Sequence, residues 1–89
     1  MTKKEYTKKR NELKKNPRSQ GLVRLLDYLW NHEKATRIDG FTELGIANFP
    51  EAVRKLRRHD IPVEMEMVSG VNRYGEAVRY GEYSIPRRR

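Results

Sequence analysis

The sequence predicts an α+β domain in which helices precede a short β-hairpin. Between residues 19 and 59, apolar side chains recur at intervals of three and four, the spacing that gives a helix one apolar face. Between residues 63 and 85, apolar and polar side chains alternate, as in a strand with one buried face. The length of 89 residues corresponds to one domain with a small core.

The first helix of this domain is expected to begin at Ser19, because serine is a good N-cap residue. Its apolar residues follow at i, i+3, i+4, i+7 and i+8, which predicts one core-facing stripe. We expect the helix to end near His32 or Glu33. The stripe consists of Leu22, Leu25, Leu26, Leu29 and Trp30.

A second, shorter helix is expected to open at Thr36. Asp39 follows three residues later, which is the spacing of a capping box. Gly45 is the natural stop, because a helix commonly ends at a left-handed position that glycine adopts without strain. The apolar side of this helix is expected to consist of Ile38, Phe41 and Leu44.

The third predicted helix runs from residue 48 to residue 59. Asn48 is a suitable cap, and Glu51 stands where it would complete a capping box. Glu51 is assigned to capping because a carboxylate there would repel phosphate. Pro50 lies in the first turn, where the missing N–H is tolerated. A second apolar stripe consists of Phe49, Ala52, Val53 and Leu56.

The last third of the chain predicts a β-hairpin. Met65 and Met67 alternate with glutamates in the first strand, and we expect both methionines in the core. Residues 72–75 are expected to form a polar turn, and residues 78–85 the returning second strand. Gly81 is expected at a bulge in that strand. Residues 19–86 thus predict a winged helix-turn-helix: three helices, with a short turn at 45–47 before the third, and a two-stranded C-terminal wing.

Basic residues concentrate at the two ends of the chain. Residues 1–18 hold eight basic and two acidic side chains, a net +6 of the total of +8. Tyr6 and Leu13 are the only sizeable apolar side chains after Met1, so we expect a flexible arm, disordered or only partly helical. Residues 87–89 form a basic tail. Such a positive charge favours a polyanionic partner, most commonly nucleic acid.

The expected partner is duplex DNA. Helix 48–59 would lie in the major groove, and the wing at residues 70–76 would touch the backbone or the minor groove. Arginine reads guanine edges or holds phosphate. The candidate DNA-binding residues are Asn48, Arg54, Lys55, Arg57 and Arg58 on the helix, Asn72, Arg73, Tyr74 and Arg79 on the hairpin, and Lys8, Lys9 and Arg10 in the arm.

Several other classes of protein are disfavoured. There is no cysteine, no apolar run long enough to cross a bilayer and no secretory signal, which together indicate a soluble cytoplasmic protein. No catalytic constellation is recognisable, so we expect neither an enzyme nor a cofactor. His32 and His59 lack partners at ligand spacing, so no metal is expected. A monomer is the default, with a dimer on DNA as an alternative.

A set of short segments between Leu22 and about Ile85 carries a family resemblance through their order and spacing. They are Leu25-Leu26-Asp27-Tyr28-Leu29, Thr36, Gly45-Ile46, Leu56-Arg57-Arg58, Ile61-Pro62-Val63, Asn72-Arg73-Tyr74-Gly75 and Arg79-Tyr80. Together they resemble a family of small helix-turn-helix proteins of bacteriophages and prophages. Gly40 departs from the family pattern, where a small helix former usually stands, and so does Asp60, where a helix-ending glycine is usual.

The resemblance implies DNA binding in a bacterial host cell without specifying a target. A transcriptional regulator and a recombination accessory factor such as an excisionase both fit, and they differ in whether binding bends the DNA. The alternative is a small phage-encoded inhibitor that binds a host or phage protein through its basic face. RNA binding is a third possibility, although the aromatic residues on the strands are expected to be buried.

Overall fold

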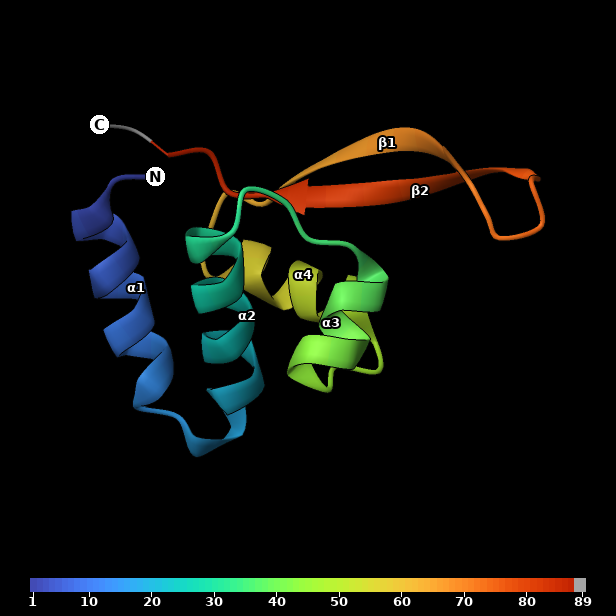
Figure 1. Ribbon diagram of the computed structural model, residues 1–89. Coiled ribbons are helices and arrows are strands. Elements are labelled where there is room, and N and C mark those ends of the chain that lie inside the picture. The colour runs from blue at the N-terminus through green and yellow to red at the C-terminus, as the bar shows by residue number, and fades with distance from the viewer. Residues whose placement is uncertain (88–89) are drawn as a thin grey trace.

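A computed structural model describes residues 1–87 of the chain (Figure 1). The fold is α+β, as predicted. Two helices lie side by side, the other two lie on the far side of the second, and a hairpin projects away from them. The described residues form helices α1 (Lys3–Lys14), α2 (Gln20–Asn31), α3 (Arg37–Leu44) and α4 (Phe49–Arg58), a 3-10 turn η1 (Pro17–Ser19), and strands β1 (Glu64–Val71) and β2 (Ala77–Ser84).

The core is built around α2. Leu25, Leu26 and Leu29 are completely or almost completely buried, as their helical stripe predicts. From α4, Phe49 and Leu56 are fully buried in the same cluster. The expected end of α2 is also close to the observed one, because the last helical residue is Asn31. None of the helices within residues 1–87 is long and apolar enough to cross a membrane.

The prediction of a flexible arm is wrong, because most of it forms the well-defined helix α1. A complete capping box between Thr2 and Glu5 starts this helix. Leu13 is buried, and Tyr6, which lies two turns earlier on the same side, stacks on Trp30 with ring centroids 4.6 Å apart. These aromatic and aliphatic contacts place α1 against α2, so few apolar residues suffice to dock it.

A polar contact also fixes α1 to α2. The Tyr6 hydroxyl donates a hydrogen bond to Asp27 Oδ1 at 2.5 Å, and Arg10 Nε donates to the same oxygen at 2.8 Å. Burial and the hydrogen bond to the Asp27 carboxylate raise the pKa of Tyr6 to about 12. Since Asp27 lies on α2, this one carboxylate joins two consecutive turns of α1 to the domain.

The expected core-facing side of α3 is wrong for two of its three residues, because Leu44 packs against the core but Ile38 and Phe41 do not. Ile38 and Phe41 are 72% and 64% exposed, while Gly40 is buried between them. The Phe49 ring packs directly on Gly40: a Cβ there would lie 2.7 Å from Phe49 Cε2 and closer still to Cδ2. The helix therefore turns its narrowest side to the core, and two large apolar side chains are left at the surface.

Capping contacts around α3 and α4 follow the sequence closely. Thr36 and Asp39 form both halves of a capping box, and Gly45 ends α3 in the left-handed region at φ 66°. Asn48 accepts a hydrogen bond from the Glu51 N–H at 3.3 Å. The second half of that box is missing, because the Glu51 carboxylate is paired with an arginine on the next turn.

The hairpin pairs without interruption. β1 and β2 are antiparallel from Glu64 opposite Ser84 to Val71 opposite Ala77. The expected bulge at Gly81 is absent, because Gly81 lies directly opposite Met67 in a one-to-one register. Gly75 supplies the positive φ of 77° that the turn needs.

The hairpin contributes less to the core than expected. Met65 and Met67 are each 47% exposed, so they are not core residues. The base of the hairpin is held by Tyr83, whose ring meets Phe49 edge-on at 4.9 Å. Ala35, between α2 and α3, forms an isolated bridge to Tyr83, with N–H to carbonyl distances of 2.9 and 2.7 Å. The outer part of the hairpin projects beyond this attachment (Figure 1).

Candidate nucleic-acid interface

Helix α4 has one buried and one basic side. Its apolar stripe faces the core, and the opposite side exposes Arg54, Lys55 and Arg58. Lys55 and Arg58 have no ion-pair partner within residues 1–87. Three cations on one exposed helical face can contact phosphates or base edges when the helix enters a groove.

Arg54 is engaged in a local ion pair. Its Nη2 lies 2.5 Å from Glu51 Oε2, one turn away on the same helix. The hydrogen bond from Arg54 holds the pKa of Glu51 below its ordinary value, so this carboxylate stays ionised at neutral pH. The sequence-based assignment of Glu51 to helix capping missed this role. Any anion that binds Arg54 has to compete with the carboxylate.

Arg57 is directed toward the hairpin. Its Nε and Nη2 both donate to the carbonyl oxygen of Val63, at 3.1 and 3.0 Å. Val63 immediately precedes β1, so this contact braces the connection between α4 and the hairpin. Arg57 therefore has a clear structural role in addition to the DNA contact predicted from the sequence.

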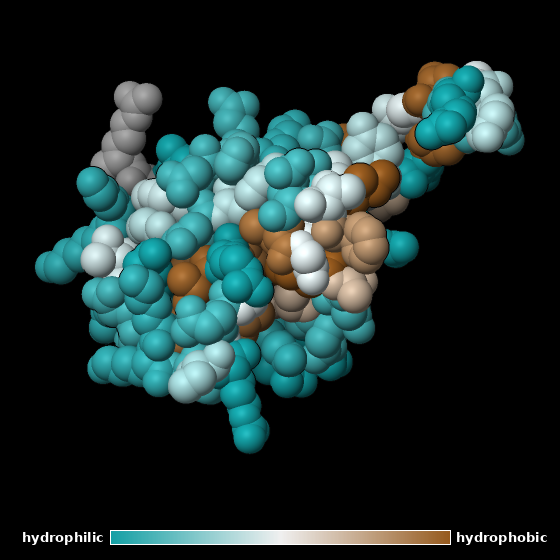
Figure 2. Space-filling model, turned by 60° about the horizontal axis from the view of Figure 1, so that its bottom comes forward, coloured by the Kyte–Doolittle hydropathy of each residue, from teal (hydrophilic) through white to brown (hydrophobic). Residues whose placement is uncertain are grey.

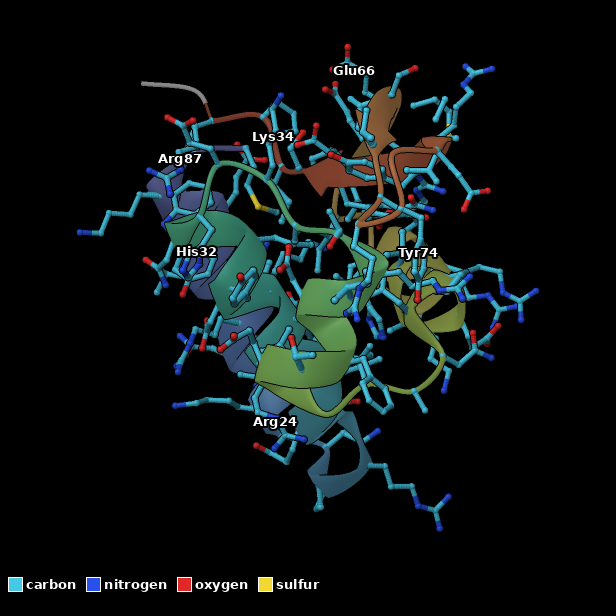
Figure 3. The ribbon with its side chains drawn as sticks, turned by 45° about the vertical axis from the view of Figure 1, so that its right-hand side comes forward. Arg24, His32, Lys34, Glu66, Tyr74 and Arg87 are labelled. Atoms are coloured by element: carbon cyan, nitrogen blue, oxygen red, sulfur yellow. The ribbon has the colours of Figure 1, made fainter. Side chains whose placement is uncertain are left out.

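The hairpin turn presents two exposed side chains and is shaped by side-chain hydrogen bonds. Asn72 Oδ1 accepts hydrogen bonds from the N–H groups of Tyr74 at 2.9 Å and Glu76 at 3.0 Å, so Asn72 shapes the turn. Arg73 and Tyr74 are exposed, and Tyr74 is 76% accessible. Figure 3 labels Tyr74 on this turn. A cation and an aromatic ring thus stand together at the tip.

The three DNA-binding candidates in the predicted arm differ in their contacts on α1. Lys8 is exposed on α1. Lys9 lies 3.8 Å from Glu12, which makes a weak ion pair on the helix surface. Arg10 contributes to docking through Asp27, and its guanidinium is only partly accessible. Of the three, Lys8 is therefore the most available to an external partner.

The surplus positive charge is localised. Residues 19–86 contain nine basic and ten acidic side chains, whereas residues 1–18 carry the net +6. Because α1 is docked on α2, this charge has a fixed position instead of belonging to a loose tail. In the predicted basic tail, Arg87 lies over the Trp30 ring at 4.9 Å, while residues 88–89 lie outside the described part of the chain.

A hollow of about 490 Å³ lies between η1 and the exposed side of α4. Three cationic side chains line it: Arg18 from η1 and Lys55 and Arg58 from α4. Asn16, Asn48 and Glu51 also line it. Arg18 was absent from the sequence-based candidates. Its position beside α4 depends on how α1 and η1 fold back onto α2, which local patterns do not indicate.

A second hollow, of about 690 Å³, lies between the hairpin and the N-terminal ends of α3 and α4. Its lining is more apolar and includes Ile38, Pro50 and Met67, with Arg37 and Arg79 among the lining residues. Figure 2 shows apolar atoms gathered in the middle of one face, beside the projecting hairpin. The candidate Arg79 thus belongs to this hollow and is not at the tip of the wing.

Comparison with protein-family profiles, curated proteins and solved structures finds no match to this chain. The resemblance to phage helix-turn-helix proteins therefore stays a prediction. Within residues 1–87, no three histidine or acidic side chains converge in a way that would hold a metal ion. The basic side of α4, the hairpin tip and the two hollows are the features that a functional proposal has to explain.

Proposed function

We propose that this chain is a winged helix-turn-helix protein that binds duplex DNA, with α4 in the major groove and the hairpin turn on the backbone or in the minor groove. The observation that carries the proposal is the exposed basic side of α4, which stands opposite its apolar stripe. The major groove of DNA is wide enough to admit an α-helix. Arginine and lysine are the side chains that most often contact guanine edges there, and they also bind phosphates.

The arrangement around α4 supports the same function. Gly45 ends α3 in the left-handed region, and a short connection leads from it to Asn48, the N-cap of α4, as in a helix-turn-helix. Arg57 and the bridge between Ala35 and Tyr83 fix the base of the hairpin relative to the helices. Arg73 and Tyr74 then project beyond the helices from a fixed base, as a groove-contacting wing requires.

The biological role that fits best is that of a phage or prophage DNA-binding protein in the bacterial cytoplasm. A transcriptional regulator and a recombination accessory factor both remain compatible with this architecture. Measurement of the DNA bend angle separates them, since an accessory factor that assembles recombination complexes is expected to bend its site.

The proposal is tested by binding to a mixed-sequence duplex, to the corresponding single strand and to RNA, each over a salt series. The duplex is expected to bind most tightly, with log affinity falling by about 0.9 per log salt for each neutralised phosphate. The pair Arg54→Ala and Arg58→Ala should reduce both affinity and slope. The matched pair Arg24→Ala and Arg87→Ala removes equal charge elsewhere. Equal binding by the two double variants would refute the role of α4.

A second candidate function is inhibition of another protein, and the apolar hollow favours it. Ile38 and Met67 are exposed there beside Arg37 and Arg79, which suits a segment carrying apolar and acidic side chains. Expression in a bacterial host tests this candidate. Growth inhibition that is lost on Ile38→Asp but kept in the Arg54/Arg58 double variant would favour it over DNA binding.

A further inference from the structure

We infer that the hollow between η1 and α4 holds a backbone phosphate of the duplex whose major groove receives α4. This inference rests on the proposed function and extends it to a contact outside the helix-turn-helix. It assigns a ligand contact to Arg18, and it makes the N-terminal segment part of a structured interface.

The cationic residues that line the hollow come from two elements. Lys55 and Arg58 are one turn apart on α4, and Arg18 of η1 lines the same hollow. A phosphate group accepts several charge-assisted hydrogen bonds at once, so a concave site with three cations suits it better than an exposed helix does. The volume of about 490 Å³ leaves room for the phosphate with bridging water.

The place of the hollow on α4 agrees with the geometry of a major groove. Arg57 and Pro50 lie on the side of α4 that faces the hairpin, as their contacts show. Asn48 and Lys55 lie on the other side and line the hollow. A helix in the major groove has one phosphate backbone on each side. The hairpin is then beside one backbone, and the hollow is beside the other.

The acidic residue in the hollow does not oppose this assignment. Glu51 lies at the wall, but its carboxylate is 2.5 Å from the Arg54 guanidinium, so the two charges offset each other. The cations that face the hollow from the two elements are Arg18, Lys55 and Arg58. His59 also lines it.

The backbone that carries Arg18 is well supported. The N–H of Arg18 donates to Asn16 Oδ1 at 3.0 Å, and the neighbouring Ser19 is buried. Leu13, at the end of α1, is also buried. Because these contacts fix the backbone of η1 before any partner arrives, the entropy lost when Arg18 binds an anion is mainly that of its exposed side chain.

The test compares Arg18→Gln with Arg87→Gln on a mixed-sequence 20-base-pair duplex over a salt series. Both variants remove one arginine charge, but Arg87 lies at the opposite end of α2 from η1 (Figure 3). If Arg18 holds a phosphate, Arg18→Gln should lower the salt slope by about 0.9 relative to Arg87→Gln. Equal slopes would overturn the inference while leaving the proposed function standing.

Two further outcomes are informative. If the wild type binds no duplex at low salt, the proposed function fails, and the inference fails with it. Titration with inorganic phosphate, followed through the backbone amide signals of Gln20 and Gly21, distinguishes the source of the phosphate. We expect only weak, millimolar-range shifts. Saturation by free phosphate at micromolar concentration would overturn the assignment to a DNA backbone and define a small-anion site.

Discussion

Replacement of Gly40 by alanine is expected to destabilise the domain, against the usual direction for a helix. Inside a helix, alanine is favoured over glycine by about 1 kcal/mol. At Gly40, however, the added Cβ would lie 2.7 Å from Phe49 Cε2 and closer to Cδ2, well inside the normal contact distance. Phe49 is completely buried and is held edge-on by Tyr83, so its ring cannot easily move away.

The size of the effect follows from these opposing terms. Overpacking a tight core costs roughly 1–3 kcal/mol, and the immobile ring places Gly40→Ala toward the upper end of that range. After the gain in helix propensity, the net loss is about 2 kcal/mol. For a domain of this size, that loss lowers Tm by roughly 10 °C. Urea and thermal unfolding followed by circular dichroism and Trp30 fluorescence would measure it.

Gly21 provides the matched control. A Cβ at Gly21 on α2 would have its nearest neighbour, Arg24 Nη2, at 3.9 Å, which is ordinary contact. Gly21→Ala should therefore be neutral or stabilising by up to about 1 kcal/mol. If Gly40→Ala were as stable as Gly21→Ala, the argument that Phe49 dictates the orientation of α3 would be refuted.

Two further predictions concern the ionisable side chains of Tyr6 and Glu51. Because the pKa of Tyr6 is raised to about 12, well above its ordinary value, its hydrogen bond to Asp27 should stabilise the fold fully below about pH 10 and progressively less as pH rises toward 12. Wild type should therefore lose more stability than Tyr6→Phe between about pH 9 and pH 12, and parallel losses in unfolding experiments would contradict this. Glu51→Gln should free Arg54 and tighten duplex binding about two- to fivefold at low salt, an effect that salt weakens. Glu33→Gln, which removes an acidic charge away from α4, is the control in the same binding assay. An equal change in both variants would show that Glu51 does not compete with DNA for Arg54.

Elements governed by local chemistry are predictable from this sequence. The stripe of α2, the capping box at Thr36 and the stop at Gly45 all depend on residues within one or two turns of each other. Asp60 illustrates the same point. Its backbone is left-handed at φ 61°, so the position has the conformation expected of a glycine although an aspartate occupies it.

Features that depend on partners far apart in the chain are not predictable from the sequence pattern. The docking of α1 needs Asp27 and Trp30, and Asp27 lies 21 residues after its partner Tyr6 in the chain. The orientation of α3 depends on the ring of Phe49 against Gly40, so Ile38 and its neighbour Phe41 face outward despite helical spacing. An apolar count within one segment cannot show either effect, because each is decided by the shape of the partner.

The candidate site was predictable to a similar degree. The exposed positions of Arg54, Lys55 and Arg58 follow from the helical period alone. The engagement of Arg57 with Val63 and of Arg54 with Glu51 does not, since each arginine has other rotamers available. Arg18 became a candidate only when the three-dimensional fold brought η1 beside α4.

The single-ended attachment of the hairpin has a consequence for amide hydrogen exchange. Near Tyr83 the backbone is paired on both sides, by β1 and by Ala35, whereas near Val71 and Ala77 the two strands have only each other. Amides should therefore exchange through global unfolding at the base and through local opening toward the turn. Such a gradient lets the tip adjust to the surface it meets without loosening the packing around Phe49.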